Sequence, residues 1–265
     1  MTRRRLDREL VRRGLAASPA EARRAIDAGR VVVGGRASAK AGTLVDPSES
    51  VTVRDPSPRY ASRGGAKLDH ALDRMSVEVR GRRCLDAGAS SGGFTDVLLS
   101  RGAAAVVAVD VGYGQLAWRL RGDPRVTVME RTNVRTLQPG DLPYRPELIA
   151  ADLSFVSLTA AVPAFRRVTA PGADLVLLVK PQFEAGRDDV EEGGVVRDPD
   201  AWRSAIERVA EACREARFGP MAVAVSPIRG PAGNVEFFLH ARDGVTSGDL
   251  DLEATIRSTG EVGVR

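Results

Sequence analysis

Long apolar runs are missing from this sequence of 265 residues. Its most apolar stretch, ADLVLLV, covers seven residues, whereas a helix that spans a membrane needs about 20. The N-terminus is basic, but no apolar segment of the kind found in signal peptides follows it. The sequence therefore predicts neither secretion nor membrane insertion.

Cysteine and histidine are scarce, with two of each. Cys84 and Cys213 have no CxxC spacing and no histidine nearby, which excludes a disulfide framework and a zinc site and favours a cytosolic protein. We expect both cysteines to be packing residues. His70 and His240 also lack partners at metal-ligand spacing, so we expect no bound metal, with His70 on a helix surface and His240 at a strand end.

The net charge of +4 is unevenly distributed along the chain. Residues 1–67 hold 15 lysines and arginines against 7 acidic residues, a net charge of +8. The remaining residues hold 24 against 28, a net charge of −4. A basic N-terminal segment on a mildly acidic body favours a polyanion-binding module, with a solubilising tail as the alternative.

Helix signals open the basic segment. RLDRELVRRGL places leucines and a valine on one helical face and arginines on the other. The stretch SPAEARRAIDAG begins with Ser18 as N-cap, Pro19 at the first helical position and Glu21 as a capping-box acid, and Gly29 ends it. VVV, a GG turn and a second strand at residues 51–53 follow. The segment therefore predicts two short helices followed by a small sheet.

Arginines cover the exposed side of these predicted helices with few acidic partners, which is typical of RNA-phosphate contacts, although a solvated helix face is the alternative. The pattern RLDRELVRRGL followed by SPAEARRAIDAGRVVVGG resembles the S4 RNA-binding domain over about 55 residues. The candidate RNA-binding residues are Arg4, Arg5, Arg12, Arg13, Arg23, Arg24 and Arg63.

From Lys67 onward, strand and helix patterns alternate. Strands are predicted near Cys84 and in AAVVAVD, VTVME, ELIAAD, DLVLLVK, MAVAVS and NVEFFLH, with helices near residues 66–74, 158–168 and 202–216. This alternation predicts a doubly wound, Rossmann-like α/β sheet with mostly parallel strands, whose ligands bind beyond the carboxyl ends of the strands. The expected organisation is a small α+β domain at 1–58, a linker at 59–66, the α/β domain at 67–245 and a tail at 246–265 with a short helix in DLEATIRS.

A glycine-rich loop, LDAGASSGGFTD at residues 85–96, follows the first strand of the α/β domain. Its glycines allow a ligand to approach the backbone, and the next helix offers free N–H groups to an anion. Asp110, about 22 residues after Gly88, ends the next strand, where an acid can accept both hydroxyls of a ribose. Thr132 and Asn133 end a third strand and could contact an adenine, so the order fits S-adenosylmethionine, with a structural turn and a surface aspartate as the alternative. The candidate cofactor-binding residues are Asp86, Gly88, Ala89, Ser90, Gly92, Gly93, Phe94, Asp110, Val111, Thr132, Asn133 and Asp152.

The sequence lacks the NPPY stretch used for exocyclic amines and the Pro-Cys nucleophile used for pyrimidine carbon. An oxygen acceptor remains, and a ribose hydroxyl must lose its proton to a base as the new bond forms. Lys180 ends an apolar strand before Pro181, and lysine can act as a base when burial and a nearby cation, here Lys67, favour its neutral form. Asp152 ends another strand and Glu236 lies inside NVEFF, where an unpaired carboxylate is costly, so we expect both acids to pair with lysines. A plain strand end for Lys180 and a solvent-facing position for Glu236 are the alternatives.

The motifs SRGGAKL, DAGASSGGFTD, VDVGYGQL, ERTNVR, DLSFVSL, LVKPQFEAG, GGVVRD and GNVEFF resemble the TlyA family of ribosomal RNA 2'-O-methyltransferases, historically labelled haemolysins, over nearly the whole chain. The resemblance implies an FtsJ/RrmJ-type class I methyltransferase domain that uses S-adenosylmethionine. It also implies methylation of cytidine ribose in 16S and, in some members, 23S rRNA of the ribosomal subunits, with sensitivity to capreomycin-class antibiotics as a consequence. The acidic run DDVEEGG at 188–194 departs from the basic loop of the family. The family's Lys-Asp-Lys-Glu catalytic tetrad falls on Lys67, Asp152, Lys180 and Glu236.

Other functions stay open at this point. A non-catalytic S4-domain ribosome-binding or assembly factor that keeps a cofactor pocket would bind RNA and form no product. A pore-forming haemolysin would need an apolar segment to insert, and the sequence has none. A pseudouridine synthase that carries an S4 domain would need a GRLD-type aspartate motif, which the sequence also lacks.

Overall fold

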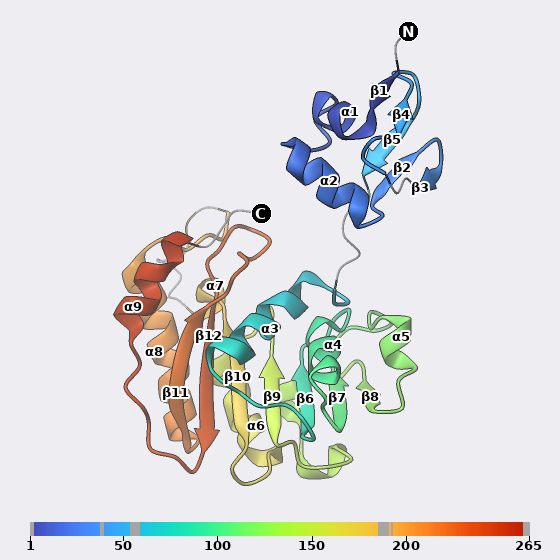
Figure 1. The fold of residues 1–265 in the computed structure, drawn as a ribbon. Coiled ribbons are helices and arrows are strands. Elements are labelled where there is room, and N and C mark those ends of the chain that lie inside the picture. Colours follow the sequence, from blue (N-terminus) through green and yellow to red (C-terminus); the bar gives the residue numbers. More distant parts are fainter. Residues whose placement is uncertain (1–2, 38–39, 54–58, 185–190, 192, 262–265) are drawn as a thin grey trace. The chain divides into compact units, whose positions relative to one another are not determined.

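The computed structural model describes residues 3–37, 40–53, 59–184, 191 and 193–261. The chain divides into two compact units, Met1–Arg59 and Tyr60–Arg265 (Figure 1). Most of the acidic run at 188–194 lies outside the described residues. No described helix is long and apolar enough to cross a membrane.

The described residues of the first unit form two helices and two small sheets. Strand β1 pairs with β4, and β2 pairs with β3 and β5, in antiparallel arrangements. Buried side chains such as Leu6, Leu10, Ile26 and Val31 form its core between the helices and the strands. The elements are β1 Arg4–Arg5, α1 Leu6–Arg12, α2 Pro19–Asp27, β2 Val31–Val33, β3 Arg36–Ala37, β4 Leu44–Val45 and β5 Val51–Val53.

The start of α2 follows the predicted capping signals. The Ser18 hydroxyl accepts a hydrogen bond from the Glu21 backbone N–H at 3.2 Å, and the Glu21 carboxylate accepts one from the N–H of Ala17 at 2.8 Å. Pro19 occupies the first helical position, where no N–H is needed. Beyond the helix, Gly29 takes the left-handed backbone conformation with φ of +66°. The predicted helix and both of its ends are confirmed.

The second unit is built on a seven-stranded sheet in the order β11-β12-β10-β9-β6-β7-β8. Strands β10, β9, β6, β7 and β8 run parallel to one another, and β12 is antiparallel to both β10 and β11. The predicted doubly wound, mostly parallel α/β sheet is confirmed. Its strands are β6 Arg83–Ala87, β7 Ala105–Val109, β8 Val126–Met129, β9 Leu148–Ala151, β10 Asp174–Val179, β11 Phe218–Val225 and β12 Phe237–Asp243.

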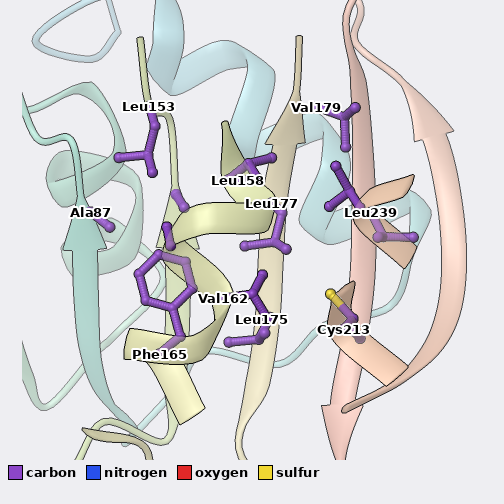
Figure 2. Close-up of a cluster of buried hydrophobic side chains, with 14 of the residues drawn as sticks. Ala87, Leu153, Leu158, Val162, Phe165, Leu175, Leu177, Val179, Cys213 and Leu239 are labelled. Atoms are coloured by element: carbon purple, nitrogen blue, oxygen red, sulfur yellow. The ribbon is translucent and has the colours of Figure 1, made fainter. Parts of the chain in front are cut away.

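Helices cover both faces of this sheet, and the inner strand β10 shows why. All six of its side chains are buried, and the five apolar ones alternate between two apolar clusters. Leu175, Leu177 and Val179 pack beneath α6 and α8 (Figure 2), while Val176 and Leu178 pack against the cluster of α3 and α4. A strand buried on both faces reads as a continuous apolar run, as DLVLLV does. The helices are α3 Arg63–Arg74, α4 Gly93–Ser100, α5 Trp118–Arg121, α6 Leu158–Val168, α7 Pro181–Glu184, α8 Pro199–Glu215 and α9 Leu252–Arg257, with short 3-10 turns at Val134–Thr136, Pro139–Asp141 and Ser258–Glu261.

The sequence pattern predicted that Glu236 lies inside a strand. This is wrong, because β12 begins one residue later, at Phe237. Phe237 pairs with Val179, the last residue of β10, so the ladder ends there. Just before the strand, the Asn234 side chain accepts a hydrogen bond from the N–H of Val196 at 2.8 Å and fixes this segment to a neighbouring loop. Glu236 is thereby placed at the carboxyl end of β10.

His240 is not at a strand end, contrary to the prediction. It lies within β12 and is 7% exposed, and its ring nitrogen is 2.7 Å from the carboxylate of Asp174 on β10. Arg82 and Arg242 bind the same carboxylate. The residue is buried because the strand lies between β10 and β11 in the sheet.

The C-terminal segment forms the predicted short helix, α9. Ile256 of this helix is buried in the cluster that covers one face of the sheet. Glu253 also pairs with Arg203 of α8, with 2.5 Å between the charged atoms. The segment is therefore packed on the second unit. Helix α3 begins at Arg63, so the last part of the predicted linker at 59–66 is helical.

Candidate active site

Two adjoining cavities lie at the carboxyl ends of the parallel strands. The first cavity, of about 350 Å³, is named the cofactor groove after its predicted ligand and is lined by Gly88, Ser90, Val109, Asp110, Val111, Gln115, Thr132, Asn133, Val134, Asp152, Leu153, Ser154, Phe155 and Val156. The second, of about 320 Å³, is named the catalytic pocket after its predicted role and is lined by Ser62, Arg63, Gly64, Lys67, Gly88, Ala89, Ser90, Ser91, Gly93, Phe94, Asp152, Ser154, Lys180, Pro231 and Glu236. Both volumes are within the usual range for small-molecule sites. The cavities adjoin, because they share Gly88, Ser90, Asp152 and Ser154.

Two lysines and two acids meet in the catalytic pocket as two ion pairs. Lys180 Nζ lies 2.5 Å from Asp152 Oδ1, and Lys67 Nζ lies 2.5 Å from Glu236 Oε2. The four residues come from the end of β10, the end of β9, helix α3 and the segment before β12. Both lysines are 8% exposed and Glu236 is 1% exposed, so little water screens the charges.

Ser154 and Glu184 belong to the same site, and the sequence interpretation did not single them out. Lys180 Nζ donates to the Ser154 hydroxyl at 2.9 Å. The buried Glu184, four residues after Lys180, accepts hydrogen bonds from the Ser157 hydroxyl at 2.5 Å and from the Leu158 N–H at 2.7 Å. The end of β10 and the segment after it therefore bind the loop between β9 and α6 at two places. Lys180 binds Ser154, and Glu184 binds Ser157 and Leu158. Only their position could have singled them out from the sequence, since both residues lie within four residues of a predicted strand end.

The glycine loop is required first by the protein's own packing. A Cβ atom at Gly88 would lie 2.4 Å from the backbone oxygen of Asp152, and one at Gly92 would lie 2.3 Å from a side-chain carbon of Leu120. Both glycines also have φ near +90°, a conformation that side chains disfavour. Gly88 lines both cavities, whereas Gly92 lines neither. The loop therefore fits strand β6 closely against β9 and leaves space above them.

Asp110 is held at the end of β7 with its carboxylate fixed. Its two oxygens accept hydrogen bonds from the backbone N–H groups of Ser90 at 2.8 Å and Gly112 at 2.7 Å. A carboxylate has about four acceptor sites in total, so each oxygen keeps the capacity to accept a further hydroxyl. The carboxylate faces the cofactor groove.

Thr132 and Asn133 line the far part of the same groove, but both have other bonds. The Thr132 hydroxyl donates to the carbonyl of Glu130 at 3.0 Å. The side-chain oxygen of Asn133 accepts from the N–H of Arg135 at 3.1 Å and caps a 3-10 turn. These contacts fix the two side chains in place at the wall of the groove.

Asp86 lies behind the glycine loop and lines neither cavity. It is fully buried, and one of its oxygens accepts hydrogen bonds from the Thr95 N–H at 2.7 Å and the Thr95 hydroxyl at 2.6 Å. Burial raises the pKa of Asp86 to about 7, although these hydrogen bonds oppose the shift. Its other oxygen has no hydrogen-bond partner among the described residues. Asp86 therefore anchors α4 and carries one buried, unpaired acceptor.

Two family models match this chain. Residues 60–243 match the model of FtsJ-like methyltransferases, and residues 4–51 match the S4 domain. The 16S/23S rRNA (cytidine-2'-O)-methyltransferase TlyA of Mycobacterium tuberculosis is 52% identical to this chain over 241 residues, which cover 91% of this chain and 90% of that protein. The chain belongs to the TlyA family of FtsJ-like methyltransferases.

Further relatives of this methyltransferase carry a different name. Hemolysin A of Brachyspira hyodysenteriae is 36% identical over 238 residues, covering 89% of this chain and 98% of that protein. A solved structure from Streptococcus thermophilus, provisionally named a hemolysin, superposes with a TM-score of 0.75 at 36% identity, covering 98% of this chain and 97% of that one. The sequence-based assignment to the TlyA family is confirmed.

The candidate RNA-binding arginines fall into two groups, and the predicted scarcity of acidic partners is wrong for one of them. Arg12 and Arg13 both bind the carboxylate of the buried Glu9, and Asp7 pairs with Arg5 at 2.9 Å and with Arg23 at 3.6 Å. Arg13 also donates to the backbone oxygen of Glu49 at 2.8 Å and is largely enclosed. The residues without an ion pair among the described residues are the exposed Arg4, Arg24 and Arg63, of which Arg63 begins α3 and lines the catalytic pocket.

Proposed function

We propose that this chain transfers a methyl group from S-adenosylmethionine to the 2'-hydroxyl of a cytidine in ribosomal RNA. The proposed substrate is 16S rRNA, with 23S rRNA as a second candidate, and the proposed place of action is the cytoplasm. Support comes from the names of the M. tuberculosis relative and of the TlyA of Campylobacter jejuni, a 23S rRNA (cytidine-2'-O)-methyltransferase at 34% identity. The observation that carries the proposal is the pair of buried lysines in the catalytic pocket.

The residues of the cofactor groove suit S-adenosylmethionine. Asp110 has acceptor capacity for ribose hydroxyls, and apolar side chains such as Val111 and Leu153 can contact an adenine ring. Behind the glycine loop, Asp86 anchors the start of α4 through Thr95 and so fixes the loop that would bind the ligand. When bound, the cofactor supplies an electrophilic methyl group on a positively charged sulfur.

Lysine is rare in this chain, which makes its use in the pocket informative. The sequence contains three lysines, Lys40, Lys67 and Lys180, among 39 basic residues. Two of the three are in the catalytic pocket. An arginine would supply charge equally well, but its guanidinium keeps its proton in proteins, whereas an amine can release and accept one. The choice of lysine over arginine in this pocket supports a role for Lys180 in proton transfer.

Lys180 acts as the base in the proposed reaction. Its amine pairs with Asp152 across the 2.5 Å contact and donates to the Ser154 hydroxyl at 2.9 Å, which orients it. Before the reaction, the amine gives up one proton to water and is then neutral. As the ribose oxygen forms its bond to the methyl carbon and the carbon–sulfur bond breaks, the hydroxyl proton moves to the neutral amine. Lys67 and Glu236 hold the opposite wall of the pocket and orient the ribose, an alignment that is a major source of rate enhancement.

The test compares Lys180→Arg with Lys40→Arg, a matched change at an exposed lysine of the S4 domain. Ribosomal subunits from cells that lack this chain are incubated with enzyme and labelled cofactor, and nucleosides are analysed by mass spectrometry. We expect wild type and Lys40→Arg to form 2'-O-methylcytidine, and Lys180→Arg to lose at least about 100-fold in turnover with cofactor affinity unchanged. Full turnover in Lys180→Arg would remove the base assignment. RNA binding without any methylated product from wild type would instead indicate a non-catalytic ribosome-binding factor.

A further inference from the structure

Three exposed aromatic rings lie near the cofactor groove, in a chain that has few aromatic residues. Aromatic residues make up 5% of the sequence, and most of the phenylalanines are buried. Yet Tyr113 is 68% exposed, Trp118 is 84% exposed and Phe155, which lines the groove, is 89% exposed. Tyr113 and Trp118 line one hollow, and large exposed apolar side chains that lie together mark an interaction site.

Tyr113 and Trp118 form, with Arg131, what we call the aromatic–arginine surface. The Arg131 guanidinium lies over the Tyr113 ring, with 4.3 Å to its centroid. Tyr113 belongs to the loop after β7, and Val111 and Gln115 of that loop line the cofactor groove. A smaller hollow beside them is lined by Tyr113, Gly114, Leu116, Trp118, Arg121 and Glu130. The surface therefore borders the groove beside β8, the strand at one edge of the sheet.

The surface is held in shape before any partner arrives. The Arg131 N–H donates to the carbonyl of Gly112 at 3.0 Å, and the Gly114 N–H donates to the Glu130 carboxylate at 2.8 Å. These bonds tie the loop after β7 to the end of β8. A fixed surface binds with a smaller loss of conformational entropy than a mobile one.

The charge of the surface selects the partner. Residues 118–135 contain five arginines and two acidic residues. Arg119, Arg121 and Arg125 are held in ion pairs with Asp96, Glu130 and Asp123. Arg131 has no carboxylate at ion-pair distance in the described part of the chain, so its charge is available to a ligand. Stacking rings beside an unpaired guanidinium group are features that bind unpaired nucleotides, through base stacking and phosphate contacts.

We infer that the aromatic–arginine surface binds unpaired nucleotides of the RNA substrate that flank the methylated ribose. This inference rests on the proposed function, because it assigns the substrate a second contact on the catalytic unit. Bases stack on Trp118 and Tyr113, and Arg131 contacts a phosphate.

Trp118 provides its own reporter. The chain has two tryptophans, and Trp202 is 9% exposed with its indole N–H bonded to the carbonyl of Val196. Full-length protein is titrated with an rRNA fragment that contains the target cytidine, and tryptophan fluorescence is followed. We expect quenching in wild type and none in Trp118→Phe, which retains a stacking ring.

Affinity for the same fragment is then measured for Trp118→Ala, Trp118→Phe, Tyr113→Ala and Arg131→Gln. Met221→Ala on β11 is the control, because its side chain is exposed at the opposite edge of the sheet. We expect Trp118→Ala to weaken RNA binding about tenfold, as for the loss of one stacked base. Trp118→Phe and Met221→Ala should bind like wild type, and all variants should keep their cofactor affinity.

Three results would overturn the inference. The first is unchanged RNA affinity in Trp118→Ala. The second is quenching of the tryptophan fluorescence by S-adenosylmethionine without RNA, together with weaker cofactor binding in Trp118→Ala. That result would show that the surface covers the cofactor groove instead of binding RNA. The third is a loss of affinity for ribosomal particles but not for free rRNA, which would indicate a protein partner. Methylation by wild type with any of these results would leave the proposed function intact, whereas RNA-dependent quenching without methylation would overturn the proposed function alone.

Discussion

Lys67 Nζ and Glu236 Oε2 lie 2.5 Å apart, although 169 positions separate the two residues in the sequence. The contact joins the second turn of α3 to the segment before β12 across the catalytic pocket. Because Glu236 is 1% exposed, its charge depends on this lysine for compensation. The pair therefore fixes one wall of the pocket and links two distant parts of the chain.

Removing one charge of this pair should strongly lower the free energy of unfolding, whereas removing both charges together should lower it less. We expect Lys67→Met and Glu236→Leu each to lower the free energy of unfolding by about 3–5 kcal/mol, because each leaves a buried charge unpaired. The double variant should lose less free energy of unfolding than the losses of the two single variants added together. Urea unfolding of the four proteins measures the coupling, with the exposed pair Arg125–Asp123 as a control expected to contribute about 0–1 kcal/mol. Strict additivity at Lys67 and Glu236 would contradict the prediction.

Asp174 should stabilise the sheet at neutral pH. Burial opposes its ionisation, but hydrogen bonds from His240, Arg242 and Arg82 outweigh this and lower the pKa of Asp174 well below its usual range. An acid with a lowered pKa contributes stability that is present above the unfolded value of about 3.9 and is lost as the pH falls through the folded value. We expect Asp174→Asn to cost about 3–5 kcal/mol at pH 7.

The difference between Asp174→Asn and wild type should shrink as the pH falls below about 4. Chemical denaturation at a series of pH values checks this. Asp200→Asn is the control, because its carboxylate is on α8 and is 87% exposed. A constant difference down to the lowest pH at which the protein folds would show that the ionised carboxylate is not the stabilising group.

Asp86 should have the opposite effect on stability. Its pKa is raised to about 7, first by burial, and since this lies above the unfolded value of about 3.9 the folded state binds the extra proton. The contribution of Asp86 is therefore greatest below pH 4 and declines as the pH rises towards 7. Asp86→Asn keeps an oxygen for Thr95 but does not titrate. Without cofactor, the stability of wild type relative to this variant should fall by roughly 2–3 kcal/mol between pH 5 and pH 8, and a flat difference would refute the shift.

The S4 arginines should separate into structural and RNA-binding residues. Arg13 is held by Glu9 and by backbone oxygens, so Arg13→Ala should lower the thermal stability of this unit. Arg24→Ala should leave stability unchanged and weaken RNA binding uniformly across sequences, with the salt dependence of log Kd reduced by about one charge. Binding isotherms at several salt concentrations, with melting curves of both variants, make the comparison. Loss of RNA affinity in Arg24→Ala through unfolding would contradict it.

Local signals predicted the parts of the fold that local interactions decide. The helix at Pro19–Asp27 follows from Ser18, Pro19 and Glu21, whose capping bonds form within a few residues. The apolar run DLVLLV predicts a buried strand because side chains on both faces of β10 are covered. Where a boundary depends on a distant partner, the pattern failed, as at Glu236, because the start of β12 is set by where β10 stops.

The sequence by itself determined the residue types of the site and the order of strands and helices. It also determined the strand ends that carry Asp110, Asp152 and Lys180. These features depend on periodicity and on polar residues that follow apolar runs. Only the tertiary structure decided that Lys180 pairs with Asp152 and Lys67 with Glu236, that Ser154 and Glu184 support them, and that Asp86 is enclosed behind the loop. The reason is that strand order in a sheet and packing of α3 on that sheet bring distant residues together, and no short-range pattern encodes a distance across the chain.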